Sequence, residues 1–139
     1  MNEQEFKDRT KRLGIQIIRV LEELPRNRTT DALARQLLRS ATSIGANYRA
    51  ACRGRSSADI IAKLGVVEEE TDETLYWLEL FSETGLLATA MVASLIAEAD
   101  EILAMTVASI KTLRTRGVEF KPDVRLVQSK IQNPKSKIS

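Results

Sequence analysis

Hydrophobic residues recur every three or four positions along most of the chain, which is the spacing of one buried face on an α-helix. The predicted helices run from about Glu3 to Leu24, from Thr30 to Arg53, from a cap at Ser56 or Ser57 to Thr84, and from Thr89 to Arg116. No part of this region alternates in the way that a half-buried β-strand does. Because the connections are short, neighbouring helices should be antiparallel. The pattern therefore predicts an all-α, up-down-up-down antiparallel four-helix bundle.

Helix-ending residues set the expected boundaries. Pro25 should stop the first helix, Thr29 or Thr30 should cap the second, and Gly85 should end the third. Gly54 and Gly117 are expected to end the second and fourth helices. The expected core takes the apolar positions of the four helices: Phe6, Leu13, Ile17, Leu21, Leu24, Leu33, Leu37, Ala41, Ile44, Tyr48, Ala51, Ile60, Leu64, Val67, Leu75, Trp77, Leu78, Phe81, Val92, Leu95, Ile96, Ala99, Ile102, Leu103, Val107 and Ile110.

The second helix carries a row of arginines opposite its apolar face. Projection at about 100° per residue aligns Arg35, Arg39, Arg49 and Arg53, with Arg55 just beyond the helix. No acid interrupts this arginine stripe. It is expected to contact either the acids of a neighbouring subunit or a nucleic-acid backbone, and we favour assembly.

The third helix carries the complementary acids. Glu68, Asp72, Glu79 and Glu83 form an acidic stripe that is suited to the arginine stripe of a neighbouring copy. A second group of polar residues comprises Lys63 and Glu70, which project onto the apolar face of the third helix, and Asn47 at the edge of the second helix. A buried charge needs a partner, so these three are expected to form an interhelix polar network. The alternative use of Glu70 is as a carboxylate of a functional site. Under the network interpretation, removing Glu70 would strand a buried cation.

Two motifs with a fixed spacing then indicate a family. The first is QLLRSATSIGAN at residues 36–47, and the second combines ADIIAK at 58–63 with Glu70, Glu73-Thr74 and Tyr76-Trp77-Leu78. Over Phe6–Leu113 the chain resembles the bacterial four-helix-bundle proteins first recognised in intervening sequences of large-subunit ribosomal RNA genes. A more distant similarity is to the accessory variability protein of diversity-generating retroelements.

The resemblance implies a closed bundle that assembles as a ring-like homopentamer and has no enzymatic activity or cofactor. Many family members carry a short acidic motif after the asparagine that corresponds to Asn47. This chain instead has Tyr48-Arg49-Ala50-Ala51 at that place, which suggests a different branch.

Length and composition indicate how the chain is divided into a domain and a tail. The 139 residues, 43% of them hydrophobic, predict one domain over residues 1–116 with a tail at 117–139. Residues 1–113 carry 14 Lys/Arg against 17 Asp/Glu, whereas residues 114–139 carry 7 against 2, so the tail is basic. The chain has no apolar run of the ~20 residues that a membrane span needs. Cys52 is the only cysteine, so an intramolecular disulfide is impossible. A cytoplasmic protein without membrane contact is expected.

Catalytic chemistry finds little support. The chain has no histidine, which removes the usual general base. The best enzymatic alternative is a Mg²⁺-dependent nucleotide hydrolase, with carboxylate pairs at Glu70/Glu73 or Glu69/Asp72 and a second pair at Glu98/Glu101. The other alternative is an accessory protein that binds the RNA or DNA backbone through the arginine stripe and the tail. The favoured prediction is a non-enzymatic, self-assembling scaffold or accessory factor whose client is a nucleic acid or a nucleic-acid enzyme.

Overall fold

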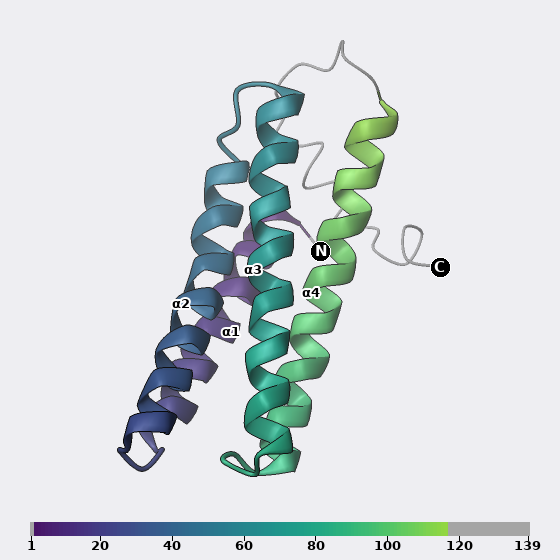
Figure 1. Cartoon of the computed structure of the whole chain (residues 1–139). Coiled ribbons are helices and arrows are strands. Elements are labelled where there is room, and N and C mark those ends of the chain that lie inside the picture. The colour runs from purple at the N-terminus through teal and green to yellow at the C-terminus, as the bar shows by residue number, and fades with distance from the viewer. Residues whose placement is uncertain (1, 117–139) are drawn as a thin grey trace.

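The computed structural model describes residues 2–116, which form four α-helices (Figure 1). They are α1 (Glu3–Glu22), α2 (Arg28–Ala51), α3 (Ser57–Glu83) and α4 (Thr89–Thr115). Figure 1 shows that successive helices run in opposite directions, and the described residues contain no strand. The predicted all-α four-helix bundle is confirmed. The predicted basic tail at 117–139 lies outside the described residues.

Capping residues explain where the helices begin, and one prediction of a cap was wrong. The side chain of Asn27, not of Thr29 or Thr30, caps α2 by accepting a hydrogen bond from the Thr30 N–H at 2.9 Å. An asparagine three residues before a free N–H has the geometry of an N-cap, so both threonines fall inside the helix. Ser56 caps α3 in the same way, through the Asp59 N–H at 3.0 Å.

The first two helices also end earlier in the chain than the sequence pattern predicted. α1 ends at Glu22 rather than Leu24, since the turn before Pro25 already leaves the helix. α2 ends at Ala51, two residues before Arg53, and the Gly54 N–H then bonds to the Ala51 carbonyl at 3.0 Å. Gly85 has φ +74°, a left-handed conformation that glycine adopts readily, and it follows the end of α3 as expected.

The core runs the length of the bundle and contains most of the expected apolar residues. Val107 is the exception, because 43% of it is exposed. The inner face of α4 is occupied instead by Met105, Thr106 and Ser109. Threonine and serine fit there because the Thr106 hydroxyl donates to the Ile102 carbonyl at 2.8 Å, and Ser109 bonds to its own helix in the same way. The predicted core of α4 was drawn from apolar residues alone, so it included Val107 and left out Thr106 and Ser109.

The four helices do not contact one another equally. α2 and α3 pack most extensively, followed by α3 with α4 and α1 with α2, whereas α1 and α4 touch at few positions. The seam between α1 and α4 is therefore the least packed side of the bundle. The polar contacts that join helices lie at this seam and between α2 and α3.

Candidate functional site

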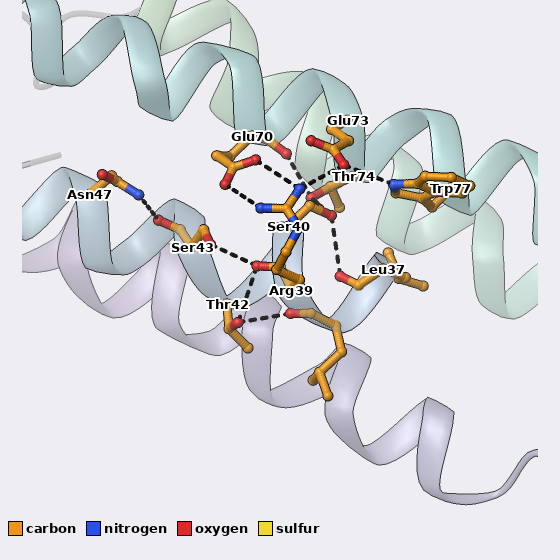
Figure 2. A network of polar contacts seen from close by, with 11 residues as sticks. Leu37, Arg39, Ser40, Thr42, Ser43, Asn47, Glu70, Glu73, Thr74 and Trp77 are labelled. Carbon is orange, nitrogen blue, oxygen red and sulfur yellow. Dashed lines mark hydrogen bonds and ion pairs between the residues drawn. The ribbon is translucent and has the colours of Figure 1, made fainter. Parts of the chain in front are cut away.

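The most connected polar group lies between α2 and α3, around Arg39 (Figure 2). Its Nη1 donates to Glu70 Oε2 at 3.0 Å, and its Nη2 donates to Glu73 Oε1 at 2.6 Å. The Trp77 indole N–H also donates to Glu73, at 3.3 Å. The hydrogen bond from Arg39, followed by that from Trp77, lowers the pKa of Glu73 below its ordinary value. One guanidinium thus joins two carboxylates that lie one helical turn apart.

Beneath this ion pair, two buried hydroxyls join the same helices. Thr74 Oγ1 lies 3.0 Å from Ser40 Oγ, and it also bonds to the Glu70 carbonyl at 2.8 Å. Ser40 and Thr74 are both fully buried. Ser40 also bonds to the Leu37 carbonyl of its own helix at 3.2 Å, so the contact between the two hydroxyls is an additional polar link between α2 and α3. Both hydroxyls belong to the motifs that indicated the family.

The predicted interhelix network is therefore wrong in its membership. Lys63 forms an ion pair with Asp59 on its own helix at 2.6 Å, and Asn47 donates to the Ser43 carbonyl of its own helix at 2.8 Å. Glu70 has an interhelix partner, but it is Arg39. The Arg39 side chain is 51% exposed, so the cation that Glu70 pairs with is not buried as expected. Arginine is long enough to reach Glu70 from a position that a helical projection places outside the interface.

A second ion pair crosses the sparse seam between α1 and α4. Arg9 Nε donates to Glu98 Oε2 at 2.5 Å, Nη2 donates to Glu98 Oε1 at 2.8 Å, and Nη2 also lies 3.2 Å from Glu101 Oε1. The side chain of Arg9 is 15% exposed. The hydrogen bond to Glu98 is the main cause of the raised pKa of Arg9. Sequence analysis missed this contact, because its partners are 89 positions apart and no local pattern links them.

These two ion pairs occupy four of the six carboxylates considered for magnesium, and Glu69 and Asp72 have no ion pair among residues 2–116. Glu70 and Glu73 face Arg39 of α2, whereas Glu98 and Glu101 face Arg9 of α1. These two carboxylate pairs are therefore bound to different arginines and do not converge. Within residues 2–116, no three His, Cys, Asp or Glu side chains are grouped so as to hold a metal ion.

The remaining members of both stripes lie on the surface. Arg35, Arg49 and Arg53 are exposed on the α2 side, and among residues 2–116 no ion pair engages them. Arg55 follows α2, and its backbone N–H bonds to Asp59 at 3.0 Å. The acidic stripe is likewise free of ion pairs within the described residues. Asp72, Glu79 and Glu83 are exposed and Glu68 is half-buried.

The charges are separated between the two halves of the bundle. Residues 2–55, with α1 and α2, carry 12 Lys/Arg against 6 Asp/Glu. Residues 56–116, with α3 and α4, carry 4 against 11. The bundle therefore has one cationic pair of helices and one anionic pair, a polarity that the small net charge of +2 conceals.

Cys52 lies at the end of α2, next to Tyr48 and near the start of α1. It is 3% exposed, and burial raises the pKa of its thiol to about 11. Burial also raises the pKa of Tyr48, whose ring packs edge-on against Phe6 with centroids 4.6 Å apart. A thiol with this pKa is overwhelmingly protonated near neutral pH and is a poor nucleophile.

Comparison with known proteins places this geometry in context. A family model described as 23S rRNA-intervening sequence protein matches residues 2–108, a range that includes both motifs and the Arg39 contacts. The crystal structure of a protein of unknown function from the S23 ribosomal protein family of Bacteroides thetaiotaomicron is similar, with a TM-score of 0.72 and 34% sequence identity. That similarity covers 76% of this chain and 98% of the other. No curated protein matches significantly. None of the four described helices is long and apolar enough to cross a membrane.

Proposed function

The chain belongs to the 23S rRNA-intervening sequence protein family, and on this premise we propose that it is a non-enzymatic, self-assembling protein that serves as a scaffold or accessory factor. The observation that carries the proposal is the separation of charge. Apart from Arg39, which is bound by Glu70 and Glu73 of its own chain, the arginine stripe has no ion pair among residues 2–116. The acidic stripe of α3 has none either, so the bundle presents a cationic and an anionic outer surface. Such surfaces attract one another between copies and repel their own kind, which favours ordered association.

For the assembled form we propose a homopentameric ring, which the family resemblance supports. A ring presents each outer surface of the bundle several times around one axis, which multiplies weak contacts with a client. The Arg39 ion pair and the buried Ser40–Thr74 contact support this role, because both join α2 to α3. Copies that share a rigid α2–α3 unit offer identical surfaces to their neighbours.

Multi-angle light scattering after size exclusion tests the proposal. We expect a species of about five times the 15.5 kDa chain mass at micromolar concentration. Raising the salt concentration should shift this species toward smaller masses, because exposed charge pairs are screened. A monomer at all concentrations up to the solubility limit would refute self-assembly.

Binding to a nucleic-acid backbone is the second candidate. Arg35 and Arg53 are exposed cations without acidic partners among residues 2–116, and an assembly would repeat them. Phosphate contacts add up steeply with their number and weaken with salt. Fluorescence anisotropy with labelled RNA and DNA of arbitrary sequence should then show salt-sensitive binding that Arg35→Gln/Arg53→Gln reduces while the oligomer stays intact. Equal binding by the variant and the wild type would contradict this candidate.

The hydrolase alternative has a separate test. Incubation with nucleoside triphosphates and Mg²⁺ should give no turnover above the buffer rate if the protein is non-enzymatic. Turnover that Glu70→Gln abolishes without lowering thermal stability would overturn our proposal. Glu83→Gln, which removes an exposed α3 carboxylate that has no ion pair among residues 2–116, is the matched control for a nonspecific loss of negative charge.

A further inference from the structure

A groove runs along the outer surface between α1 and α2. It has a volume of about 460 Å³, and its lining includes the small residues Gly14, Ala41, Gly45 and Ala46. The helices come close here because Gly45 has no side chain. A Cβ atom at this position would lie 3.3 Å from Thr10 Oγ1. Small residues on both helices therefore leave a shallow channel where larger ones would form a ridge.

The groove is apolar toward the end at Ile18 and mainly basic toward the end at Lys7, where Asp8 is the one acid among its lining residues. Ile15 and Ile18 line it and are 40% and 39% exposed, which is high for isoleucine. Lys11 and Arg49 stand at the rim and have no ion pair among the described residues. A second depression continues from Ile18 toward Leu38, which is also 39% exposed. The combined surface fits an occupant that carries both apolar side chains and acids on one face.

The outer face of α3 has this chemistry. Val66 and Tyr76, 37% and 54% exposed, lie on the same side of α3 as the exposed acids Glu69, Asp72 and Glu79. The spacing of these five residues follows the i, i+3, i+4 rule for one helix face. The Tyr76 ring is held edge-on against Trp77, with centroids 5.1 Å apart, so it stands in a defined position.

We propose that the outer face of α3 in one copy of the chain lies in the α1–α2 groove of the next copy. This inference rests on the proposed self-assembly and names the two surfaces that meet. Val66 and Tyr76 are separated by about 15 Å along their helix, and Lys7 and Ile18, at the two ends of the groove, by about 16 Å. The lengths therefore match. In this alignment Val66 lies at the Ile18 end of the groove and Tyr76 at the Lys7 end. Glu69 and Asp72, which lie between them on α3, then approach Lys11 and Arg49.

The contact is heterologous, because the two surfaces differ. No residue of α3 lines the groove or the depression that continues it. Each copy thus offers one groove and one α3 face, and a chain of such contacts grows until it closes as a ring or continues as a filament. This geometry also revises the role of the arginine stripe. Arg49 faces the neighbour, whereas Arg39 is already bound by Glu70 and Glu73 of its own chain.

Two variants test the groove and the α3 face separately. Ala46→Trp fills the groove and leaves α3 unchanged, whereas Val66→Lys/Tyr76→Lys removes the apolar part of the α3 face and leaves the groove unchanged. Each variant alone should lose the wild-type assembly, as measured by light scattering. Ala93→Trp and Met91→Lys/Val107→Lys are the matched controls on exposed positions of α4, and they should keep the wild-type mass. Circular dichroism checks that every variant is folded.

Mixing the two variants gives the decisive result. The intact groove of one accepts the intact α3 face of the other, and growth stops there, so the mixture should contain a heterodimer of about twice the chain mass. Two variants that remain monomeric when mixed would overturn the proposed contact, as would variants that assemble like the wild type. If Ala46→Trp does not fold, Lys11→Glu/Arg49→Glu replaces it in the same experiment. A monomeric wild type would instead refute the self-assembly on which the inference rests.

Discussion

The turn between α2 and α3 allows a sharp test of how tightly the bundle is packed. Gly54 is buried there, and a Cβ atom at this position would overlap Ile60 Cγ1 and lie 3.1 Å from the Ala51 carbonyl oxygen and 3.2 Å from Ile60 Cα. Ile60 is fully buried, so its side chain has no free space to move into. The Ile60 backbone is also fixed, because its N–H bonds to the Ser56 carbonyl at 2.9 Å.

Gly54→Ala should therefore destabilise the protein. Overpacking a buried site costs about 1–3 kcal/mol. The loss of glycine's flexibility in the unfolded chain offsets about 0.4–1 kcal/mol of this. The φ of Gly54 is not positive, so backbone strain adds nothing. The net expectation is a decrease of about 1–2 kcal/mol in the free energy of unfolding.

Gly65→Ala is the matched control, since it makes the same chemical change in the middle of α3. A Cβ atom there would have no heavy atom within 4 Å, so the substitution only improves helix propensity. It should stabilise by about 0.5–1 kcal/mol. The two variants should then differ by roughly 8 °C in Tm. Urea denaturation followed by circular dichroism, at one protein concentration because assembly shifts stability, measures both. A Gly54→Ala protein as stable as Gly65→Ala would refute the packing argument.

Three further predictions concern the polar contacts. Arg9→Met should lower the free energy of unfolding by about 1–2 kcal/mol, because Glu98 loses its charged partner, while Arg19→Met on the exposed side of α1 should change it by less than about 0.5 kcal/mol. Arg39→Met should lower the free energy of unfolding at neutral pH. The difference in stability from the wild type should shrink as the pH falls below the ordinary glutamate pKa of 4.5, because the lowered pKa of Glu73 stabilises the folded state only while Glu73 is ionised. A stability difference that is independent of pH would contradict the ion pair between Arg39 and Glu73. Cys52 should react with a thiol reagent far more slowly in the folded protein than in urea, because it is buried and its pKa is raised to about 11; equal rates would show that the end of α2 is open.

Sequence reasoning determined the helices and their order well. Helix boundaries and order depend on local properties: the 3.6-residue repeat, the prolines and glycines, and the short connections. These properties can be identified in the sequence without knowledge of the tertiary structure. The two motifs of α2 and α3 also identified the family without the fold. Their residues include Ser40, Thr74 and Glu70, which the structure brings together at the α2–α3 interface.

Helical projection failed where long side chains or hydroxyls decide the contact. It placed Arg39 on the outside, yet its guanidinium reaches Glu70 and Glu73 across the interface. It placed Val107 inside, although the hydroxyl residues of α4 satisfy themselves on their own helix and face the core. A helical projection gives the direction of each Cα–Cβ bond, but it contains no information on how far the side chain extends or which carbonyl it can reach.

Partner choice was decided by the tertiary structure alone. The contact of Arg9 with Glu98 and the groove beside Gly45 depend on which helices lie next to each other and how closely. An amphipathic pattern states that a helix has an inner face, but many partners satisfy that requirement equally. Only the packed bundle selects one of them, because close packing admits a single arrangement in which the small residues, the buried hydroxyls and the charged pairs all fit at once.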